Sequence, residues 1–100
     1  MTELDKLEEY LDEHGYIYER IADEIQKPFF IDQIIVYRDE SREKKIWEVI
    51  CHPGSYGYEQ GLLEIIGSIV QNNGLVEGYL TAEDVVKRLV KNNDGLATQS

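Results

Sequence analysis

The chain has 100 residues, of which twenty are acidic and ten basic, so its net charge is −10 at pH 7. This length is enough for one domain with a single core, and the hydrophobic fraction of 42% argues against disorder. The negative charge disfavours direct binding of nucleic acid, because the phosphate backbone is also negative. A single cysteine excludes an intrachain disulfide, and without a signal-peptide pattern or an apolar run of membrane-spanning length we expect a cytoplasmic protein without membrane contact.

The first predicted element is a helix over 2–13. Thr2 and Asp5 resemble a capping box, in which each side chain binds the backbone N–H of the other residue. Apolar residues recur at helical spacing at Leu4, Leu7 and Leu11. Gly15 follows as a stop signal. The apolar stripe is narrow, so we expect most of the helix circumference to face water.

Two strands follow, at 32–38 and 45–52, and the charged loop between them predicts a hairpin. The first is rich in β-branched and aromatic residues, and the second has apolar residues on both faces. The segment 16–21 fits both a strand and a helix; we favour a strand, followed by an irregular or one-turn helical segment to Lys27.

The most apolar segment predicts a helix over 57–72, which would be the element around which the domain is organised. Its apolar residues fall at helical spacing, at Tyr58, Leu62, Ile65, Ile66 and Ile69. Asn73-Gly74 would end the helix, since glycine readily takes the left-handed conformation found there. We expect this helix to cover one face of the sheet.

The end of the chain predicts a short strand at 75–80 and an amphipathic helix at 81–92. Residues 96–100 would form a frayed tail. The order of helix, strands, helix, strand and helix predicts a single α+β domain over 1–95, with a small antiparallel sheet.

Three motifs carry a resemblance to a group of proteins. They are LEEYL with HGYIYER near the start, HPGSYGYEQGLLEI in the middle, and GYLTAEDVVKRL near the end. With these motifs the chain resembles small acidic proteins encoded by prophages and other mobile elements of gut bacteria. The resemblance covers nearly the whole chain. It implies a mobile-element context, and it brings no activity and no catalytic residues.

The acidic residues gather near the start of the chain. Residues 1–24 contain nine carboxylates and two cations, which leaves −7 of the total charge of −10 in that quarter. An acidic helix face favours docking on a basic protein surface, although solubility alone would also explain the charges. The predicted partner-binding residues are four carboxylates and two tyrosines that follow the second strand, namely Glu8, Glu9, Asp12, Glu13, Tyr56 and Tyr58.

The turn before the predicted helix 57–72 offers an alternative site. Backbone N–H groups at a helix N-terminus attract anions, so this turn predicts a small-ligand or anion site formed by His52, Gly54, Ser55 and Gly57. Ser55 and the glycines would equally serve as a cap and a tight turn. The turn lacks the Gly-Lys-Ser/Thr ending of a phosphate-binding P-loop.

No pattern predicts an enzyme. Cys51 and His52 are adjacent in a predicted strand, where successive side chains point to opposite faces, so they would not form a nucleophile and base. The cysteine and histidines also lack the spacing of a structural zinc site. We therefore expect a non-enzymatic protein-interaction module without metal or cofactor. Its partner would be a protein with a basic surface, encoded by the mobile element or by its host.

Overall fold

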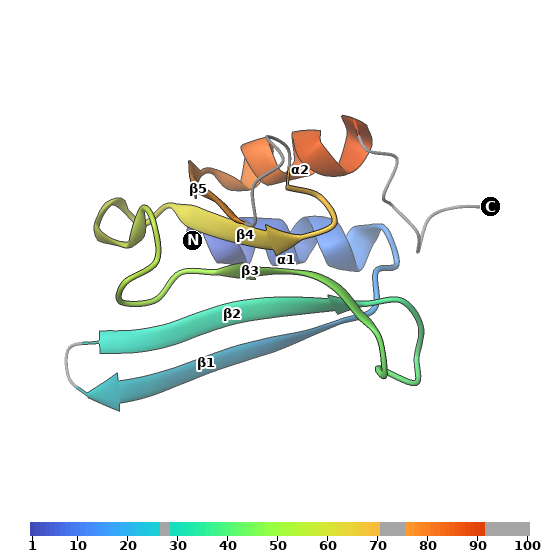
Figure 1. The fold of residues 1–100 in the computed structure, drawn as a ribbon, viewed down its shortest axis with the longest axis horizontal. Helices are drawn as coiled ribbons and strands as arrows, with labels where there is room; N and C mark the ends of the chain where they lie inside the picture. Colours follow the sequence, from blue (N-terminus) through green and yellow to red (C-terminus); the bar gives the residue numbers. More distant parts are fainter. Residues whose placement is uncertain (27–28, 71–75, 92–100) are drawn as a thin grey trace.

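The computed structural model describes residues 1–26, 29–70 and 76–91, with side chains described for all of these except 23–26 and 29–30. Five strands form one antiparallel sheet in the order β1-β2-β3-β4-β5, so each strand pairs with its neighbour in the sequence. The elements are α1 (Glu3–Glu13), β1 (Tyr18–Gln26), β2 (Phe29–Tyr37), β3 (Lys45–Ile50), the 3₁₀ turn η1 (Tyr58–Gln60), β4 (Leu63–Gly67), β5 (Val76–Leu80) and α2 (Ala82–Lys91). Figure 1 shows both helices on the same side of the sheet. The fold is α+β, as predicted.

The core lies between the helices and the inner face of the sheet. On this face Val36 lies opposite Trp47, and Val49 lies between Ile34 and Ile65 on the neighbouring strands. All five are at most 1% exposed, because alternate strand residues point toward the helices. The helices complete the core with Leu4, Leu7, Leu11, Val85 and Leu89.

Matching caps start the two helices. The Thr2 hydroxyl accepts a hydrogen bond from the backbone N–H of Asp5 at 3.1 Å, and the Asp5 carboxylate accepts one from the N–H of Thr2 at 3.0 Å. This confirms the predicted capping box. Thr81 and Asp84 form the same pair at the start of α2. Since caps of this kind satisfy N–H groups that the first helical turn leaves open, the sequence specifies where both helices begin.

Glu3 joins the two helix starts. Its carboxylate accepts a hydrogen bond from the backbone N–H of Ala82 at 2.7 Å, across 79 residues of sequence. This hydrogen bond is the main reason that the pKa of Glu3 lies below its ordinary value of 4.5. Glu3 therefore holds α1 against α2 more strongly when it is ionised than when it is protonated.

Acid should weaken this contact. Because the pKa of Glu3 is lower in the folded than in the unfolded chain, its contribution to stability is complete above about pH 4.5 and is lost as the pH falls through the lowered folded value. We expect Glu3→Gln to reduce the loss of thermal stability between pH 6 and pH 3, measured by circular dichroism melts. Glu9→Gln, at an exposed site on the same helix, is the control. Equal acid sensitivity of wild type and Glu3→Gln would contradict the assignment.

The predicted helix over 57–72 is wrong. Residues 58–60 form the single turn η1, and residues 63–67 form strand β4, while residues 71 and 72 lie outside the described part of the chain. The three glycines of the segment, Gly57, Gly61 and Gly67, have positive φ angles of 98°, 73° and 115°, which do not occur in a right-handed helix. The run Leu63–Ile66 is compatible with either structure. In the structure this run pairs antiparallel with β3, from Trp47↔Gly67 to Ile50↔Glu64, so its backbone and the edge of β3 satisfy each other's hydrogen bonds.

The strands also differ from their predicted bounds. The predicted strand 16–21 corresponds to β1, which begins only at Tyr18. It continues to Gln26, where the sequence predicts an irregular or one-turn helical segment; residue 27 lies outside the described chain. Pairing with β2, which begins at Phe29 rather than residue 32, extends this hairpin. The predicted strand 45–52 ends at Ile50. The predicted elements at 75–80 and 81–92 correspond to β5 and α2, although residues 75, 92 and the predicted tail 96–100 lie outside the described range.

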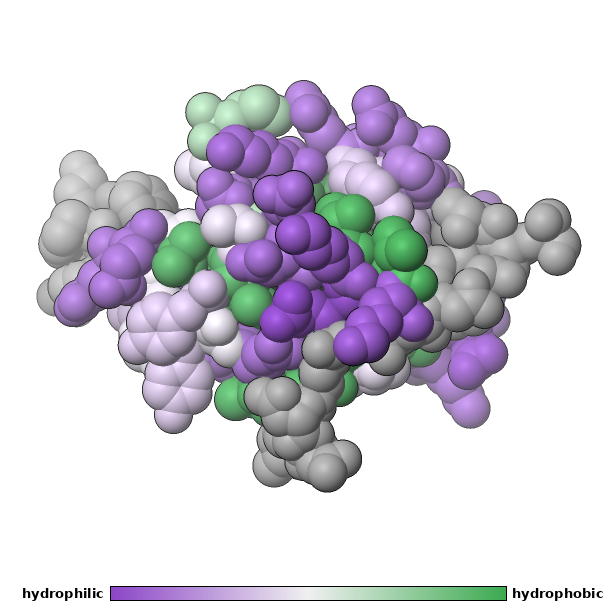
Figure 2. Space-filling model, turned by 90° about the horizontal axis from the view of Figure 1, so that it is seen from above, coloured by the Kyte–Doolittle hydropathy of each residue, from purple (hydrophilic) through white to green (hydrophobic). Residues whose placement is uncertain are grey.

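The face over α2 is mostly hydrophilic. In Figure 2 the hydrophobic residues on this face appear only in small groups between polar ones. Val90 of α2 is an exposed aliphatic residue, at 69% exposure. Neither described helix has the length and apolarity that a membrane span requires.

Candidate functional site

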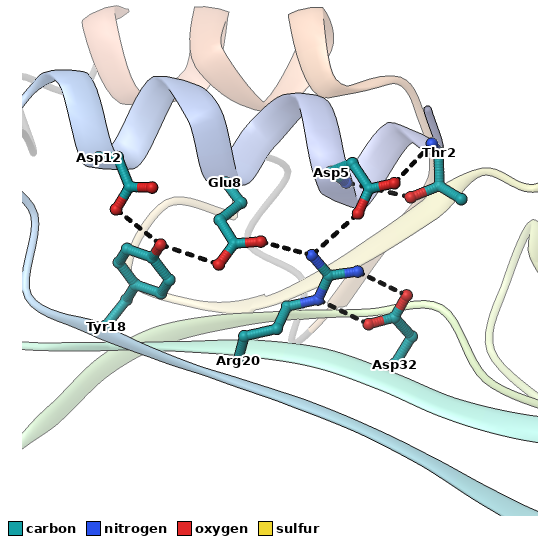
Figure 3. A network of polar contacts seen from close by, with 7 residues as sticks. All are labelled: Thr2, Asp5, Glu8, Asp12, Tyr18, Arg20 and Asp32. Carbon is teal, nitrogen blue, oxygen red and sulfur yellow. Dashed lines mark hydrogen bonds and ion pairs between the residues drawn. The ribbon is translucent and has the colours of Figure 1, made fainter.

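Two of the four predicted partner-binding carboxylates, Glu8 and Asp12, make hydrogen bonds to other residues of the same molecule. Figure 3 shows carboxylates of α1 directed at two residues of β1. The Arg20 guanidinium donates to Asp5 at 3.1 Å and to Glu8 at 2.7 Å, and it also binds both oxygens of Asp32 at 2.8 and 2.9 Å. Arg20 occupies this position because it lies opposite Ile34, on the face of the sheet that the helices cover. The network attaches α1 to the first hairpin.

Tyr18 extends this network by one more turn of α1. Its hydroxyl lies 2.9 Å from a Glu8 oxygen and 2.7 Å from an Asp12 oxygen, and its single hydrogen is donated to one of them at a time. Burial, followed by these two carboxylates, raises the pKa of Tyr18, so the phenol stays protonated. The pKa of Arg20 is also raised, mainly by its hydrogen bonds to Asp32. Both groups therefore keep their protons at neutral pH and remain hydrogen-bond donors to the carboxylates.

The four predicted carboxylates consequently have two different roles. Glu8 binds both Arg20 and Tyr18, and Asp12, although exposed, binds Tyr18. Glu9 and Glu13 are exposed on α1 and are the two left for an outside partner. The sequence indicated an amphipathic helix but not that its acidic face would meet a cation and a phenol from a strand. That pairing depends on where α1 lies over β1 in the folded protein, and no local pattern in the sequence indicates that position.

The turn between β3 and β4 is held by internal hydrogen bonds. The Ser55 hydroxyl accepts from the backbone N–H of His52 at 3.1 Å. The backbone N–H of Tyr56 donates to the Glu64 carboxylate at 2.7 Å, and the Tyr56 carbonyl accepts from the N–H of Tyr79 at 3.3 Å. The turn is therefore attached to both β4 and β5.

These contacts remove the basis of the predicted anion site. The site required the N-terminus of a long helix, and the structure has only the three-residue turn η1 there. The Tyr56 N–H is already paired with a carboxylate of the protein itself, Glu64, which is 7% exposed. His52, Gly54, Ser55 and Gly57 do lie together in the turn, but an external anion would meet the negative charge of Glu64 beside them.

Two tyrosines form the most exposed aromatic surface of the described residues. The rings of Tyr56 and Tyr79 lie 6.3 Å apart at an angle of 29°, and the residues are 56% and 59% exposed. The predicted site residue Tyr58 lies nearby in η1 and is half-buried. Sequence analysis missed Tyr79, which was assigned only to a strand. The glycine before it, Gly78, is a sequence feature that marks the close approach of Tyr56 to β5, because a side chain at Gly78 would collide with Tyr56.

Tyr79 has an unusual backbone conformation. Its φ angle is +60°, which is rare for a residue other than glycine and typically costs about 1–3 kcal/mol. The register between β4 and β5 shifts at this point. Gly57 packs so closely against Tyr79 that an added Cβ would lie 3.1 Å from the Tyr79 Cα. The surrounding structure thus holds Tyr79 in a strained and exposed position.

A pocket of about 280 Å³ lies beside this tyrosine pair. Residues 53–55 and 57–60 line it together with Tyr79. A second depression of about 470 Å³ lies between the start of β1 and the β2–β3 hairpin, at Tyr16, Ile17, Tyr18, Glu40 and Arg42. It is wider and more open than the first, and Tyr18, one of its walls, already belongs to the α1 network.

The residues singled out for chemistry in the sequence are Cys51 and the candidate metal ligands. Cys51 is half-buried against the core, and burial, with the charge of Asp32, raises its pKa and disfavours the reactive thiolate. Among the described residues, no three His, Cys, Asp or Glu side chains come together as ligands for a metal ion.

No family model, no curated protein and no solved structure matches the chain.

Proposed function

We propose that the protein is a non-enzymatic interaction module that binds a partner protein with a basic surface. The observation that carries this proposal is the stacked pair Tyr56–Tyr79, in which both residues are more than half exposed and Tyr79 has a strained backbone. Tyrosines are enriched in the energetic centres of protein interfaces, since one ring buries a large area with little loss of side-chain freedom. Backbone strain is retained mainly where it serves a function.

The net charge supports the basic character of the partner. A charge of −10 over 100 residues repels acidic surfaces and accelerates association with basic ones. Glu9 and Glu13 of α1 are exposed and suited to this steering, whereas Glu8 and Asp12 serve the fold. The resemblance to mobile-element proteins favours a host protein as the partner, which the protein would bind or inhibit.

A capture experiment tests this function. The immobilised protein is exposed to a bacterial lysate, the captured protein is identified and purified, and its affinity is measured at 50 and 300 mM salt. We expect a basic partner whose affinity falls with salt, and a roughly 5- to 30-fold loss for Tyr56→Ser.

Charge reversals locate the steering surface. Glu9→Lys with Glu13→Lys should slow association, while Glu40→Lys with Glu43→Lys, at exposed hairpin positions, changes the net charge equally and should have a smaller effect. A captured partner that is acidic, or whose affinity is unchanged by salt and by Tyr56→Ser, would contradict the proposal.

A further inference from the structure

The pocket beside the tyrosine pair has the size for one side chain. Its volume of about 280 Å³ is at or below the lower limit of typical small-molecule sites, which span about 300–1,000 Å³. It is open to the surface, and one of the residues that line it, Tyr79, is 59% exposed. A single long side chain of a docked protein would therefore fill it better than a cofactor would.

The wall of the pocket is preorganised. The N–H groups of Gln60 and Leu62 both donate to the Gly57 carbonyl, at 3.0 and 2.9 Å, and the N–H of Tyr58 donates to the Ser55 carbonyl at 3.2 Å. Tyr79 is held against Gly57 on the other side. Because these backbone hydrogen bonds fix the turn from within, binding of a side chain loses little backbone conformational entropy.

The chemistry of the wall favours a cation. Two aromatic residues, Tyr58 and Tyr79, are among those that line the pocket, and Glu59 is the only charged residue among the described residues that do so. Aromatic faces attract cations, and a carboxylate beside them supplies the counter-charge. Arginine suits such a site better than lysine, since its planar guanidinium stacks on a ring and also pairs with a carboxylate.

We propose that this pocket receives one arginine side chain of the basic partner, stacked on Tyr79 and paired with Glu59. This inference rests on the function proposed above and names the contact that gives it specificity. It differs from the acidic-helix prediction, because it places recognition at the β3–β4 turn and leaves α1 to steer the approach.

Short peptides test the pocket without the natural partner. The probes are a Gly/Ser peptide with one central arginine flanked by two lysines, the same peptide with citrulline at the centre, and a third with lysine there. Binding to the ¹⁵N-labelled protein is followed by NMR. We expect the arginine peptide to shift the amide signals of Gly57, Tyr58 and Tyr79, and to bind about 3- to 30-fold more tightly than the citrulline peptide.

Variants assign the interaction to named groups. Tyr79→Ala should lose most of the arginine preference, and Tyr79→Phe should keep it, since only the ring is needed. Glu59→Gln should weaken the arginine peptide several-fold, whereas Glu9→Gln, at an exposed carboxylate of α1, should not. The NMR spectrum of each variant shows whether it remains folded.

The two proposals fail in different ways. Equal affinity for the arginine and citrulline peptides, or signal shifts confined to α1, would overturn the arginine pocket while partner capture still stood. Equal affinity for the lysine peptide would overturn the assignment to arginine. If the protein captured no basic partner but still preferred the arginine peptide, the proposed function of binding a basic partner protein would be contradicted instead.

Discussion

Gly67→Ala should be one of the most destabilising single substitutions in this protein, at about 2–6 kcal/mol. Gly67 has a φ angle of +115°, which an alanine adopts only with strain. It also lies opposite Trp47, where an added Cβ would be 2.7 Å from the Ile46 carbonyl oxygen and 2.8 Å from the Trp47 Cα. Both neighbours are backbone atoms of β3, so the strands would have to separate.

A second glycine isolates the steric contribution. Gly61 also has a positive φ, of 73°, but an added Cβ there would meet no atom within 4 Å. Gly61→Ala should therefore show backbone strain alone, about 1–2 kcal/mol. Urea denaturation monitored by Trp47 fluorescence measures both. Equal costs for the two variants would mean that β4 does not approach β3 as closely as described.

Ile65→Ala should cost about 2–5 kcal/mol, the usual range when a large aliphatic side chain is removed from a closed core. Ile65 is fully buried, lies opposite Val49 and faces the helices. Its neighbour Ile66 points to the other face of the sheet, opposite Glu48, and is half-buried. Ile66→Ala should cost only about 1 kcal/mol, because part of that side chain remains in water.

This pair of variants distinguishes the strand from the helix that the sequence suggested. On a helix over 57–72, Ile65 and Ile66 would share the apolar stripe, and the two substitutions would have similar effects. In β4 they face opposite sides, so their effects should differ by more than about 1 kcal/mol in urea denaturation. Similar losses at both positions would contradict the strand.

The elements with local signals were predictable from the sequence. Thr2 with Asp5 and Thr81 with Asp84 specify the helix starts through hydrogen bonds within four residues. The strands around Ile34 and Trp47 were recognisable because β-branched and aromatic residues favour a pleated, buried surface. These signals were sufficient for the α+β class, since each depends on neighbours in sequence.

The candidate site was predictable only in part. Tyr56 and the acidic character of the surface follow from the sequence, whereas the stacking of Tyr56 on Tyr79 depends on a turn that lies against a shifted strand pair. Likewise, the sequence presents Glu8 and Asp12 as unpaired helix charges. The structure shows that they accept hydrogen bonds from Arg20 and Tyr18 of β1. Contacts between residues far apart in sequence determine both outcomes.

The sequence alone determined the helix caps, the hairpin of β2 and β3, and the net negative charge, because each is a property of neighbouring residues or of composition. Only the tertiary structure decided that residues 63–67 form a strand, which carboxylates remain at the surface, and where the exposed tyrosines meet. The physical reason is that the backbone hydrogen bonds of a run such as Leu63–Ile66 can form within a helix or with a neighbouring strand. Only the position of that strand in the folded chain distinguishes the two. The open edge of β3 makes the sheet the better solution.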